Sequence, residues 1–270
     1  MKIYIPSMAR SGLKDIQSGP TSDMGPDLLE RTMYVVPGEE VLLYRESLDA
    51  LGRQSVGVIA CPERGIARTR LAIGEHAHDS GAEMFCMLDD DIRFLVRKSE
   101  DGWQLRGTEP GDVSQMFAAV SHWLNCGYSH VGVSAREGNN IAGVGGKDLR
   151  NECTRTIRFL AYRTEDFLGV EHGRVDVMED FDVNLQLIEQ GKPNVSLFYW
   201  AQGQKMTNAP GGCSTYRSHE VHERSAHRLA ELHPRHVKLR TKNNKTDADG
   251  FGTRTEVTIM WKQCYEENKK

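Results

Sequence analysis

The sequence predicts an α/β protein with a mostly parallel sheet flanked by helices. In the first half of the chain, short apolar segments alternate with helical ones, the order typical of parallel sheets. The chain of 270 residues is also long enough to bury one large core or two small ones. Both observations favour a layered domain in which helices pack on a sheet.

The first predicted strands are short apolar runs bounded by glycine, proline or charged residues. They cover residues 2–5, 33–36, 56–61 and 84–88, with helices expected at 38–48 and 65–78. The second helix carries one inward face, made of Ile66, Arg70, Ile73 and Ala77.

The pattern changes after Asp91. We expect a hairpin from residues 94–97 and 103–106, a helix at 113–125, strands at 130–133, 154–162 and 195–200, and a helix at 179–189. From about residue 203 the sequence turns polar and then basic. The expected division is therefore a core at 1–202 and a C-terminal extension at 203–270 that closes over the site.

Composition excludes several classes of protein. With 34 Lys and Arg against 38 Asp and Glu, the chain does not bind nucleic acid by bulk charge, although a local basic patch is compatible with it. No apolar run is long enough for a membrane span, and the first residues are unlike a signal peptide. Six scattered cysteines without a C-x-x-C pair predict no disulfide framework or zinc knuckle, and a cytoplasmic setting.

Three consecutive aspartates, Asp89, Asp90 and Asp91, directly follow an apolar run of five residues. Sheets of this class bind ligands beyond the carboxyl ends of their strands. If the alternation of a strand continues, Asp89 and Asp91 project to one side and Asp90 to the other. Two such carboxylates suit a hard divalent cation that carries a diphosphate. The alternative interpretation of the three aspartates is a solvated acidic turn at the end of the strand.

Two basic features lie near the first strands. The small-residue loop at 6–12 could offer backbone N–H groups to a ligand. Arg64 and Arg68 lie on one face at a helix start, where positive charge is unfavourable unless an anion offsets it. The alternative is a pair of exposed arginines bound to Glu63 or Glu75.

An acidic segment at 176–182 opens a later amphipathic helix. Asp180 comes directly before inward-facing Phe181, so its carboxylate could act as a general base at a helix start over the sheet. The alternative is that these acids only stabilise the helix dipole.

The C-terminal region is rich in histidine and basic residues. Five of the ten histidines lie at positions 219, 222, 227, 233 and 236, and residues 217–245 hold eight Lys or Arg against three Glu. One of these histidines could complete a metal site, and the alternative for each is a surface or structural role.

Together these segments resemble the GT-A-fold glycosyltransferases, and more narrowly the phage TET-associated glycosyltransferases. The likeness rests on residues 3–7 with Arg10, and on 65–70, 88–91, 178–180 and 214–217. It implies a metal-dependent enzyme that moves a sugar from a nucleotide-sugar, usually a UDP-sugar, to the hydroxymethyl group of a modified pyrimidine in DNA. It also implies a phage-encoded protein of the host cytoplasm.

The resemblance also assigns roles to residues. The donor would be bound by Pro6, Ser7, Arg10, Arg64, Arg68, Asp89 and Asp90. A Mn²⁺ or Mg²⁺ ion would be held by Asp91, Asp89 and a late histidine, His219 in preference to His222. Asp180, with Glu179, would be catalytic and give inversion, and the DNA would be contacted by Arg217, Arg235, Lys238 and Arg240.

Three other functions stay open from the sequence. A transferase acting on a glycan or protein would keep the carboxylates but leave the basic C-terminal stretch without a use. A metal-dependent nuclease would use the aspartates and histidines, although no His-x-Asp pair accompanies them. A non-catalytic DNA-binding protein would have no use for the three aspartates.

Overall fold

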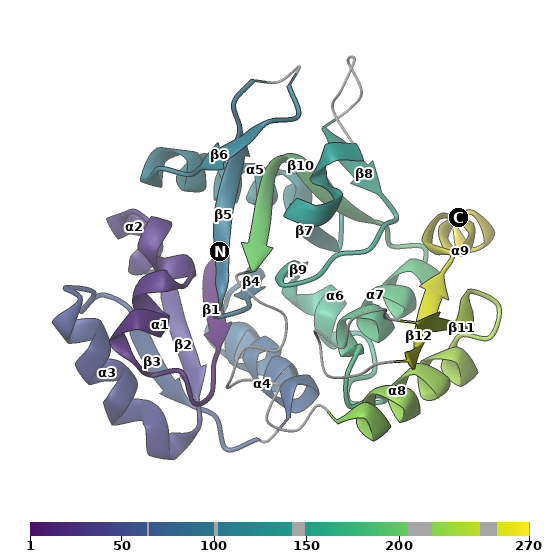
Figure 1. The fold of residues 1–270 in the computed structure, drawn as a ribbon, viewed down its shortest axis with the longest axis horizontal. Coiled ribbons are helices and arrows are strands. Elements are labelled where there is room, and N and C mark those ends of the chain that lie inside the picture. The colour runs from purple at the N-terminus through teal and green to yellow at the C-terminus, as the bar shows by residue number, and fades with distance from the viewer. Residues whose placement is uncertain (64, 100–101, 142–148, 205–217, 244–252, 270) are drawn as a thin grey trace.

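The computed structural model describes residues 1–63, 65–99, 102–141, 149–204, 218–243 and 253–269 (Figure 1). A large central sheet has helices on both faces, so the predicted α/β architecture is confirmed. Among the described residues, no helix has both the length and the apolar character needed to cross a bilayer.

The central sheet has the strand order β3-β2-β1-β4-β9-β7-β10-β5-β6, and β8 pairs with β10. Strands β3, β2, β1 and β4 are parallel, as are β7 and β10, whereas β9 and β5 run the other way. The strands are β1 (Lys2–Pro6), β2 (Thr32–Val36), β3 (Gly57–Ala60), β4 (Met84–Leu88), β5 (Ile92–Arg97), β6 (Leu105–Gly107), β7 (His130–Ala135), β8 (Arg150–Glu152), β9 (Phe159–Arg163) and β10 (Asn194–Gln204). A separate hairpin is formed by β11 (Val237–Asn243) and β12 (Thr253–Ile259).

Helices cover both faces of the sheet. The α-helices are α1 (Leu13–Ser18), α2 (Pro26–Leu29), α3 (Val41–Ala50), α4 (Ile66–Asp79), α5 (Pro110–Asn125), α6 (Thr164–Leu168), α7 (Glu179–Glu189), α8 (His219–Leu232) and α9 (Trp261–Asn268). Short 3-10 turns are η1 (Pro20–Asp23), η2 (Gly38–Glu40) and η3 (Arg136–Ile141).

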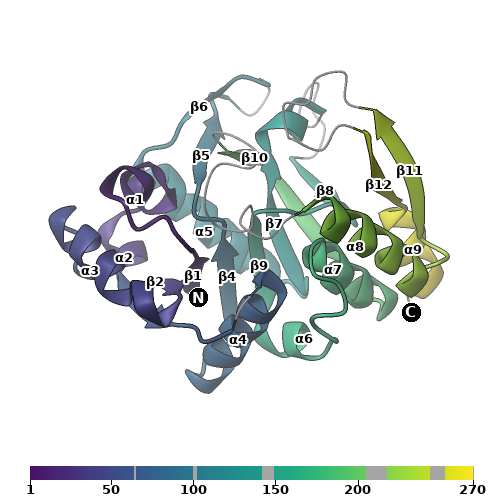
Figure 2. The same cartoon turned by 60° about the horizontal axis from the view of Figure 1, so that its bottom comes forward.

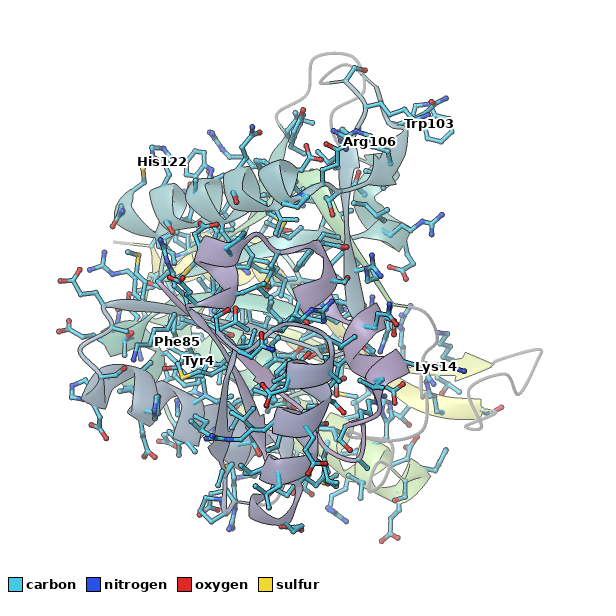
Figure 3. The ribbon with its side chains drawn as sticks, turned by 90° about the vertical axis from the view of Figure 1, so that its left-hand side faces the viewer. Tyr4, Lys14, Phe85, Trp103, Arg106 and His122 are labelled. Carbon is cyan, nitrogen blue, oxygen red and sulfur yellow. The ribbon has the colours of Figure 1, made fainter. Side chains whose placement is uncertain are left out.

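The alternation of side chains along the strands divides the core into two layers. Ile3 and Ile5 of β1 pack on one face with α3 and α5. Tyr4 packs on the other face with α4, α6 and α7. There it meets Phe85 of β4 edge-on, with ring centroids 6.2 Å apart, and Figure 3 shows the two side by side in the interior. Strands buried on both faces account for the continuous apolar runs in the sequence.

The C-terminal part forms a third layer beside α7. Helices α8 and α9 and the β11–β12 hairpin share a core with the far side of α7, and both views place them together (Figures 1 and 2). Strand β10 runs to Gln204, two residues past the division expected from the sequence. The described C-terminal residues therefore rest on α7, the helix that begins with the predicted catalytic carboxylates.

Two predicted elements differ from the structure. The strand expected at 154–162 is central, but only Phe159–Arg163 is extended, because Arg158 adopts a left-handed conformation with φ of 65°. The helix expected at 38–48 begins as a 3-10 turn and becomes α-helical only at Val41.

Candidate active site

The site begins where two neighbouring parallel strands end. β1 pairs in parallel with β4, so the loop after Pro6 and the aspartates after Leu88 meet at one edge of the sheet. β9 starts at the same edge, where the Asp89 N–H donates to the Arg158 carbonyl over 2.9 Å. The topology therefore gathers loops from three strands around the acidic cluster.

Asp90 holds the loop after β1 in place. The Arg10 backbone N–H donates to the Tyr44 hydroxyl (3.3 Å), Tyr44 donates to Ser7 (2.6 Å), and Ser7 donates to one Asp90 oxygen. The Arg10 guanidinium binds the other oxygen. Burial raises the pKa of Asp90 to about 6, against the lowering effect of Arg10. Both Asp90 oxygens are thus used to position the loop after β1.

Asp91 has one carboxylate oxygen in use and one without a partner. Its Oδ2 accepts hydrogen bonds from Arg10 (3.0 Å) and from the side chain of Gln204 (2.7 Å) at the end of β10. Its Oδ1 is buried and has no hydrogen-bond partner among the described residues. A buried carboxylate oxygen left unpaired is costly, and a divalent cation would satisfy it. Asp91 therefore fits the metal-ligand role predicted from the sequence.

Asp89 faces a buried arginine on α4. Its Oδ1 lies 3.4 Å from a guanidinium nitrogen of Arg70, and its side chain is 32% exposed. Arg70 also binds Glu179, the first residue of α7, from the opposite side. Although burial lowers it, the pKa of Arg70 is raised overall by the carboxylates of Glu179, Asp180 and Asp89. Arg70 stays charged and joins the two acidic segments.

The predicted alternation of the aspartates is wrong in one respect. Arg10 bridges Asp90 and Asp91, which were expected to face opposite sides. The physical reason is that β4 ends at Leu88, so the three aspartates lie in a turn and no longer follow the period of a strand.

The start of α7 presents the second acidic segment. Met178 precedes the helix in a left-handed conformation, with φ of 68°. Asp180 accepts the N–H of Phe181 over 3.0 Å. Asp180 and Glu179 line a small pocket together with Arg70 and the buried side chain of Tyr162 from β9. The helix start therefore brings its carboxylates to a hollow beside the sheet edge.

Three residues around this edge have left-handed backbones without being glycine. They are Ala9 after β1 (φ 56°), Arg158 before β9 (φ 65°) and Met178 before α7 (φ 68°). Such conformations cost of order 1 kcal/mol each and persist only where surrounding contacts impose them. The loops that border the acidic cluster are therefore held in fixed shapes.

The basic residues predicted near the donor do not share one environment. Arg64 lies outside the described residues. Arg68 is exposed and forms a 3.7 Å ion pair with Glu63, the arrangement weighed as an alternative from the sequence. Arg70, two residues further, is the arginine that points into the site. Sequence reasoning put Arg70 on the inward face of the helix but gave it no role, although a charge on a buried face needs a partner.

The two competing histidines lie along α8. The His219 Nε2 is 3.1 Å from the Thr253 carbonyl, to which it donates. The His222 Nε2 donates in the same way to the Thr255 carbonyl over 3.0 Å. Both histidines thus attach α8 to β12, and metal binding by His219 stays a prediction.

The residues predicted to contact DNA also differ in their surroundings. Arg217 lies outside the described residues. Arg235 forms an ion pair with Glu267 over 2.6 Å. Lys238 and Arg240 are exposed on β11, and Lys242 continues the same alternate positions. These three side chains lie on the side of the hairpin opposite to buried Val237.

Comparison with known proteins agrees with these features. A family model described as TET-Associated Glycosyltransferase matches residues 1–212, which include β1, the aspartates and the start of α7. The chain belongs to the TET-associated glycosyltransferase family. The family resemblance predicted from the sequence is confirmed, and the chain is a glycosyltransferase.

Two relatives of this glycosyltransferase come from bacteriophages. The beta-glucosyl-HMC-alpha-glucosyl-transferase of Enterobacteria phage T2 is 27% identical, over 92% of this chain and 88% of the relative. The protein of the same name from Enterobacteria phage T6 is 26% identical, over 100% of this chain and 94% of the relative. Among solved structures, S. aureus TarS with UDP-GlcNAc has a TM-score of 0.45 at 11% identity, covering 85% of this chain and 67% of that chain.

Proposed function

We propose that this glycosyltransferase moves a sugar from a nucleotide-sugar, with a UDP-sugar as the donor, to a modified pyrimidine in DNA. The observation that carries the proposal is the pairing of two acidic segments across Arg70, one after β4 and one at the start of α7. The first segment suits a charged leaving group and the second suits proton transfer from an acceptor.

The donor half of the site comprises the loop after β1 and the aspartates. Ser7 and Arg10 are fixed by Asp90, so the loop keeps its shape before a ligand arrives. Pro6 ends the strand, and the Ser7 backbone N–H donates to the Val35 carbonyl of β2 (3.0 Å), which attaches the start of the loop to the neighbouring strand. We therefore assign the nucleotide and diphosphate to this loop.

The residues present also fit a divalent cation. Asp91, through its unpartnered Oδ1, and partly exposed Asp89 would hold Mn²⁺ or Mg²⁺, with His219 as the predicted third ligand. Oxygen-rich sites of this kind are those that hard cations prefer. When bound, the ion would offset negative charge on the departing nucleoside diphosphate.

Proton transfer is assigned to Asp180. The Glu179 carboxylate is engaged by Arg70 and is nearly buried, which suits positioning more than proton transfer. Asp180 lines the same pocket, and the N–H of Phe181 fixes one of its oxygens. Its carboxylate is thus held in one orientation, from which it can accept a proton from an acceptor hydroxyl as that oxygen attacks the sugar.

The acceptor is inferred from the relatives and from the basic hairpin. Both phage relatives are named for action on beta-glucosyl-HMC, and they match nearly the whole chain. Two acceptors follow: the hydroxymethyl group of the base, or a glucose that the base already carries. Either presents a hydroxyl to Asp180, and the exposed Lys238 and Arg240 suit contact with DNA phosphates.

The test is a transfer assay with defined DNA. Purified protein is mixed with a panel of nucleotide-sugars, Mn²⁺ or Mg²⁺, and duplexes that are unmodified, hydroxymethylated or glucosyl-hydroxymethylated, and digested nucleosides are weighed by mass spectrometry. We expect a mass gain of one sugar only on modified duplexes. Transfer to oligosaccharides alone would move the acceptor to glycans, and cleavage of DNA without a nucleotide-sugar would favour a nuclease.

The anomer of the product tests the role of Asp180. Inversion requires a base at the acceptor hydroxyl, so an α-linked donor would give a β-linked product. The relatives are named for forming an alpha-glucosyl bond. An α-linked product from an α-linked donor would mean retention, and Asp180 would then not be an inverting base.

A further inference from the structure

A second group of potential metal ligands lies far from the aspartates in the fold. It consists of Glu189 at the end of α7, His236 in the turn before β11, and Cys264 in α9. One donor atom from each lies within 4.8 Å of the others. Three elements of the C-terminal layer thus bring a carboxylate, an imidazole and a thiol together, without the sequence spacing of a zinc knuckle.

The His236 ring is oriented toward this group. Its Nε2 donates to the Glu267 carboxylate over 3.0 Å, which in the neutral tautomer leaves a lone pair on Nδ1. His236 is only 3% exposed, and its Nδ1 has no hydrogen-bond partner among the described residues. That nitrogen lies 3.6 Å from Glu189 Oε1. An unpartnered buried nitrogen beside a carboxylate, in a group that also holds a thiol, indicates that a cation fits among them.

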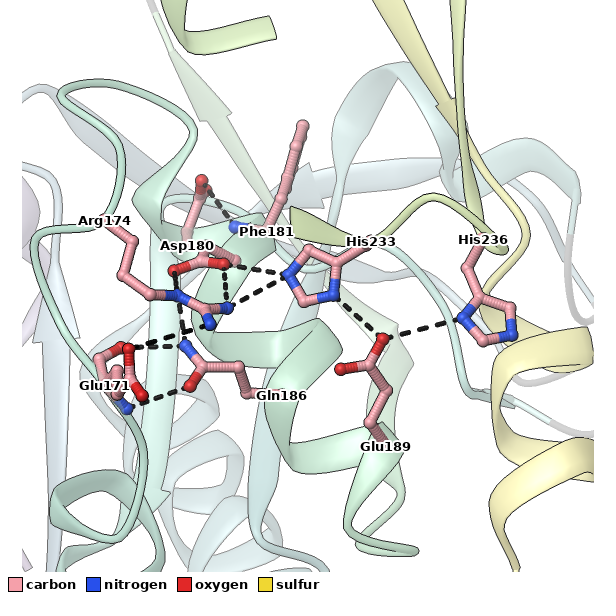
Figure 4. Close-up of polar contacts among 9 residues, drawn as sticks. Glu171, Arg174, Asp180, Phe181, Gln186, Glu189, His233 and His236 are labelled. Carbon is pink, nitrogen blue, oxygen red and sulfur yellow. Dashed lines mark hydrogen bonds and ion pairs between the residues drawn. The ribbon is translucent and has the colours of Figure 1, made fainter. Parts of the chain in front are cut away.

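Outer contacts hold the carboxylate of the group. Glu189 Oε1 accepts a hydrogen bond from His233 Nδ1 over 2.8 Å (Figure 4). The other ring nitrogen of His233, Nε2, lies 2.9 Å from Asp182 Oδ1. Asp182 is in turn bound by Arg174. Metal ligands are usually held in orientation by hydrogen bonds to carboxylates and histidines that do not themselves bind the metal. Glu189 and His236 are both oriented in this way.

We propose that Glu189, His236 and Cys264 bind a Zn²⁺ ion, at a site separate from Asp89 and Asp91. Thiolate and imidazole ligands select zinc, whereas Mn²⁺ and Mg²⁺ prefer the oxygen ligands at the sheet edge. Donor atoms around tetrahedral zinc lie roughly 3.3 to 3.8 Å apart, so the 3.6 Å separation of His236 Nδ1 and Glu189 Oε1 already fits. The Cys264 thiol lies within 4.8 Å of both, so a small shift of its side chain completes the set. The Glu189 side chain is 34% exposed, so water can reach the fourth position.

The ion would cross-link the layer that carries the basic hairpin to the helix that carries Asp180. Glu189 ends α7, and Asp180 lies in its first turn. His236 directly precedes β11, which carries Lys238 and Arg240. The bound zinc would therefore fix the spacing between the predicted DNA contacts and the catalytic helix.

The test uses the full chain carrying Asp91→Asn, so that cations at the sheet edge do not interfere. Zinc is measured after purification and dialysis, and Co²⁺ is then substituted, because a thiolate bound to Co²⁺ gives a charge-transfer absorption that carboxylates do not. We expect about one zinc per chain and this absorption. Cys264→Ser and His236→Asn should lose both, whereas Cys61→Ser, at a buried cysteine elsewhere, should keep both.

The outcomes are distinct. Chelation should lower the Tm of the parent and of Cys61→Ser, but not that of Cys264→Ser, because a ligand that binds the native state stabilises it. Absence of zinc and of the thiolate band in the parent protein would overturn the proposal, whatever the variants do. So would a band that persists in Cys264→Ser. His236 would then be a buried ring that contacts Glu189 and Glu267 without a metal.

Discussion

Single residues decide how six charged groups coexist at one edge of the sheet. Arg10 binds Asp90 and Asp91 on one side, and Arg70 binds Asp89 and Glu179 on the other. Without these cations the buried carboxylates would repel one another strongly. The arginines also join segments distant in sequence, so the geometry of the site depends on guanidinium groups that bind on two sides.

Arg70→Lys tests this bridging. An ammonium keeps the charge but lacks the planar fork that reaches Asp89 and Glu179 together. Losing one charged hydrogen bond should lower kcat/KM by about tenfold or more. The matched control is Arg68→Lys in the same helix, whose exposed side chain pairs with Glu63 in the part of the chain that the structure describes, and it should change steady-state kinetics far less. Equal effects of both substitutions would refute a bridging role for Arg70.

Asp91→Asn tests the cation site. The amide should lose cation-dependent donor binding and reduce transfer by about 100-fold or more, because a metal contributes several kcal/mol to charge stabilisation. The variant should be no less stable than the parent without metal, since repulsion with Asp89 and Asp90 falls. Donor titrations with and without Mn²⁺, followed by Tm, check both statements. A variant that turns over near the parental rate would remove Asp91 from metal binding.

Asp180→Asn should separate binding from chemistry. A general base acts mainly in the transition state, so kcat should fall by about 100-fold or more while donor Kd stays the same. Equilibrium donor binding and single-turnover transfer measure the two quantities. If donor affinity drops as much as turnover, Asp180 has a structural or ligand role.

At the level of secondary structure, the sequence predicted the main strands and helices up to residue 202 from their apolar periodicity. It predicted no element beyond that point, although helix α8 also has one buried face. The strands before Ser7 and Asp89 were placed correctly because they are buried on both faces. The β11–β12 hairpin was not predicted, since Lys238, Arg240 and their neighbours are exposed and give no apolar alternation. The pairing of Arg70 with Glu179 was also out of reach, because it joins residues 109 positions apart.

His130, where β7 pairs with β9, makes the free energy of unfolding depend on pH. This ring is 1% exposed and stacks on Tyr162 with centroids 4.2 Å apart. Its Nδ1–H donates to the Ala161 carbonyl (3.0 Å), so in the neutral ring Nε2 accepts from Thr156. Burial lowers the pKa of His130 to about 4, with the Ala161 carbonyl opposing this effect.

Because the folded-state pKa lies below the usual 6.5, the stability that neutral His130 contributes is complete above pH 6.5 and is lost as pH falls toward 4. The free energy of unfolding should fall by about 3 kcal/mol over this range. Its slope against pH should be at most about 1.4 kcal/mol per pH unit. Denaturant unfolding of the parent and His130→Asn across this range measures it. The variant should show a flatter dependence, whereas His122→Asn, on the exposed side of α5 (Figure 3), should follow the parent. Parallel curves for all three proteins would disprove the assignment.

Over the whole molecule, α7 connects two surfaces with opposite charge. Its first turn lies at the acidic sheet edge, and its far side shares a core with α8, α9 and the basic hairpin. The formal net charge of the chain is −4, so attraction to DNA has to come from a local surface. The row Lys238, Arg240 and Lys242 on β11 is such a surface, because alternate residues of a strand share a side.

Replacing Lys238, Arg240 and Lys242 together with Ala should weaken DNA binding without affecting the donor site. If each side chain neutralises one phosphate, the log–log slope of affinity against salt should flatten by roughly three contacts at about 0.9 each. The apparent KM for DNA should rise, and hydrolysis of the donor by water should be unchanged, because that reaction needs no DNA. The control is Arg235→Ala, whose guanidinium is already paired with Glu267 and should therefore contribute less than any member of the row. Unchanged DNA affinity of the triple variant at two salt concentrations would show that the row is only a solvated face. The acceptor would then have to be sought among glycans or proteins.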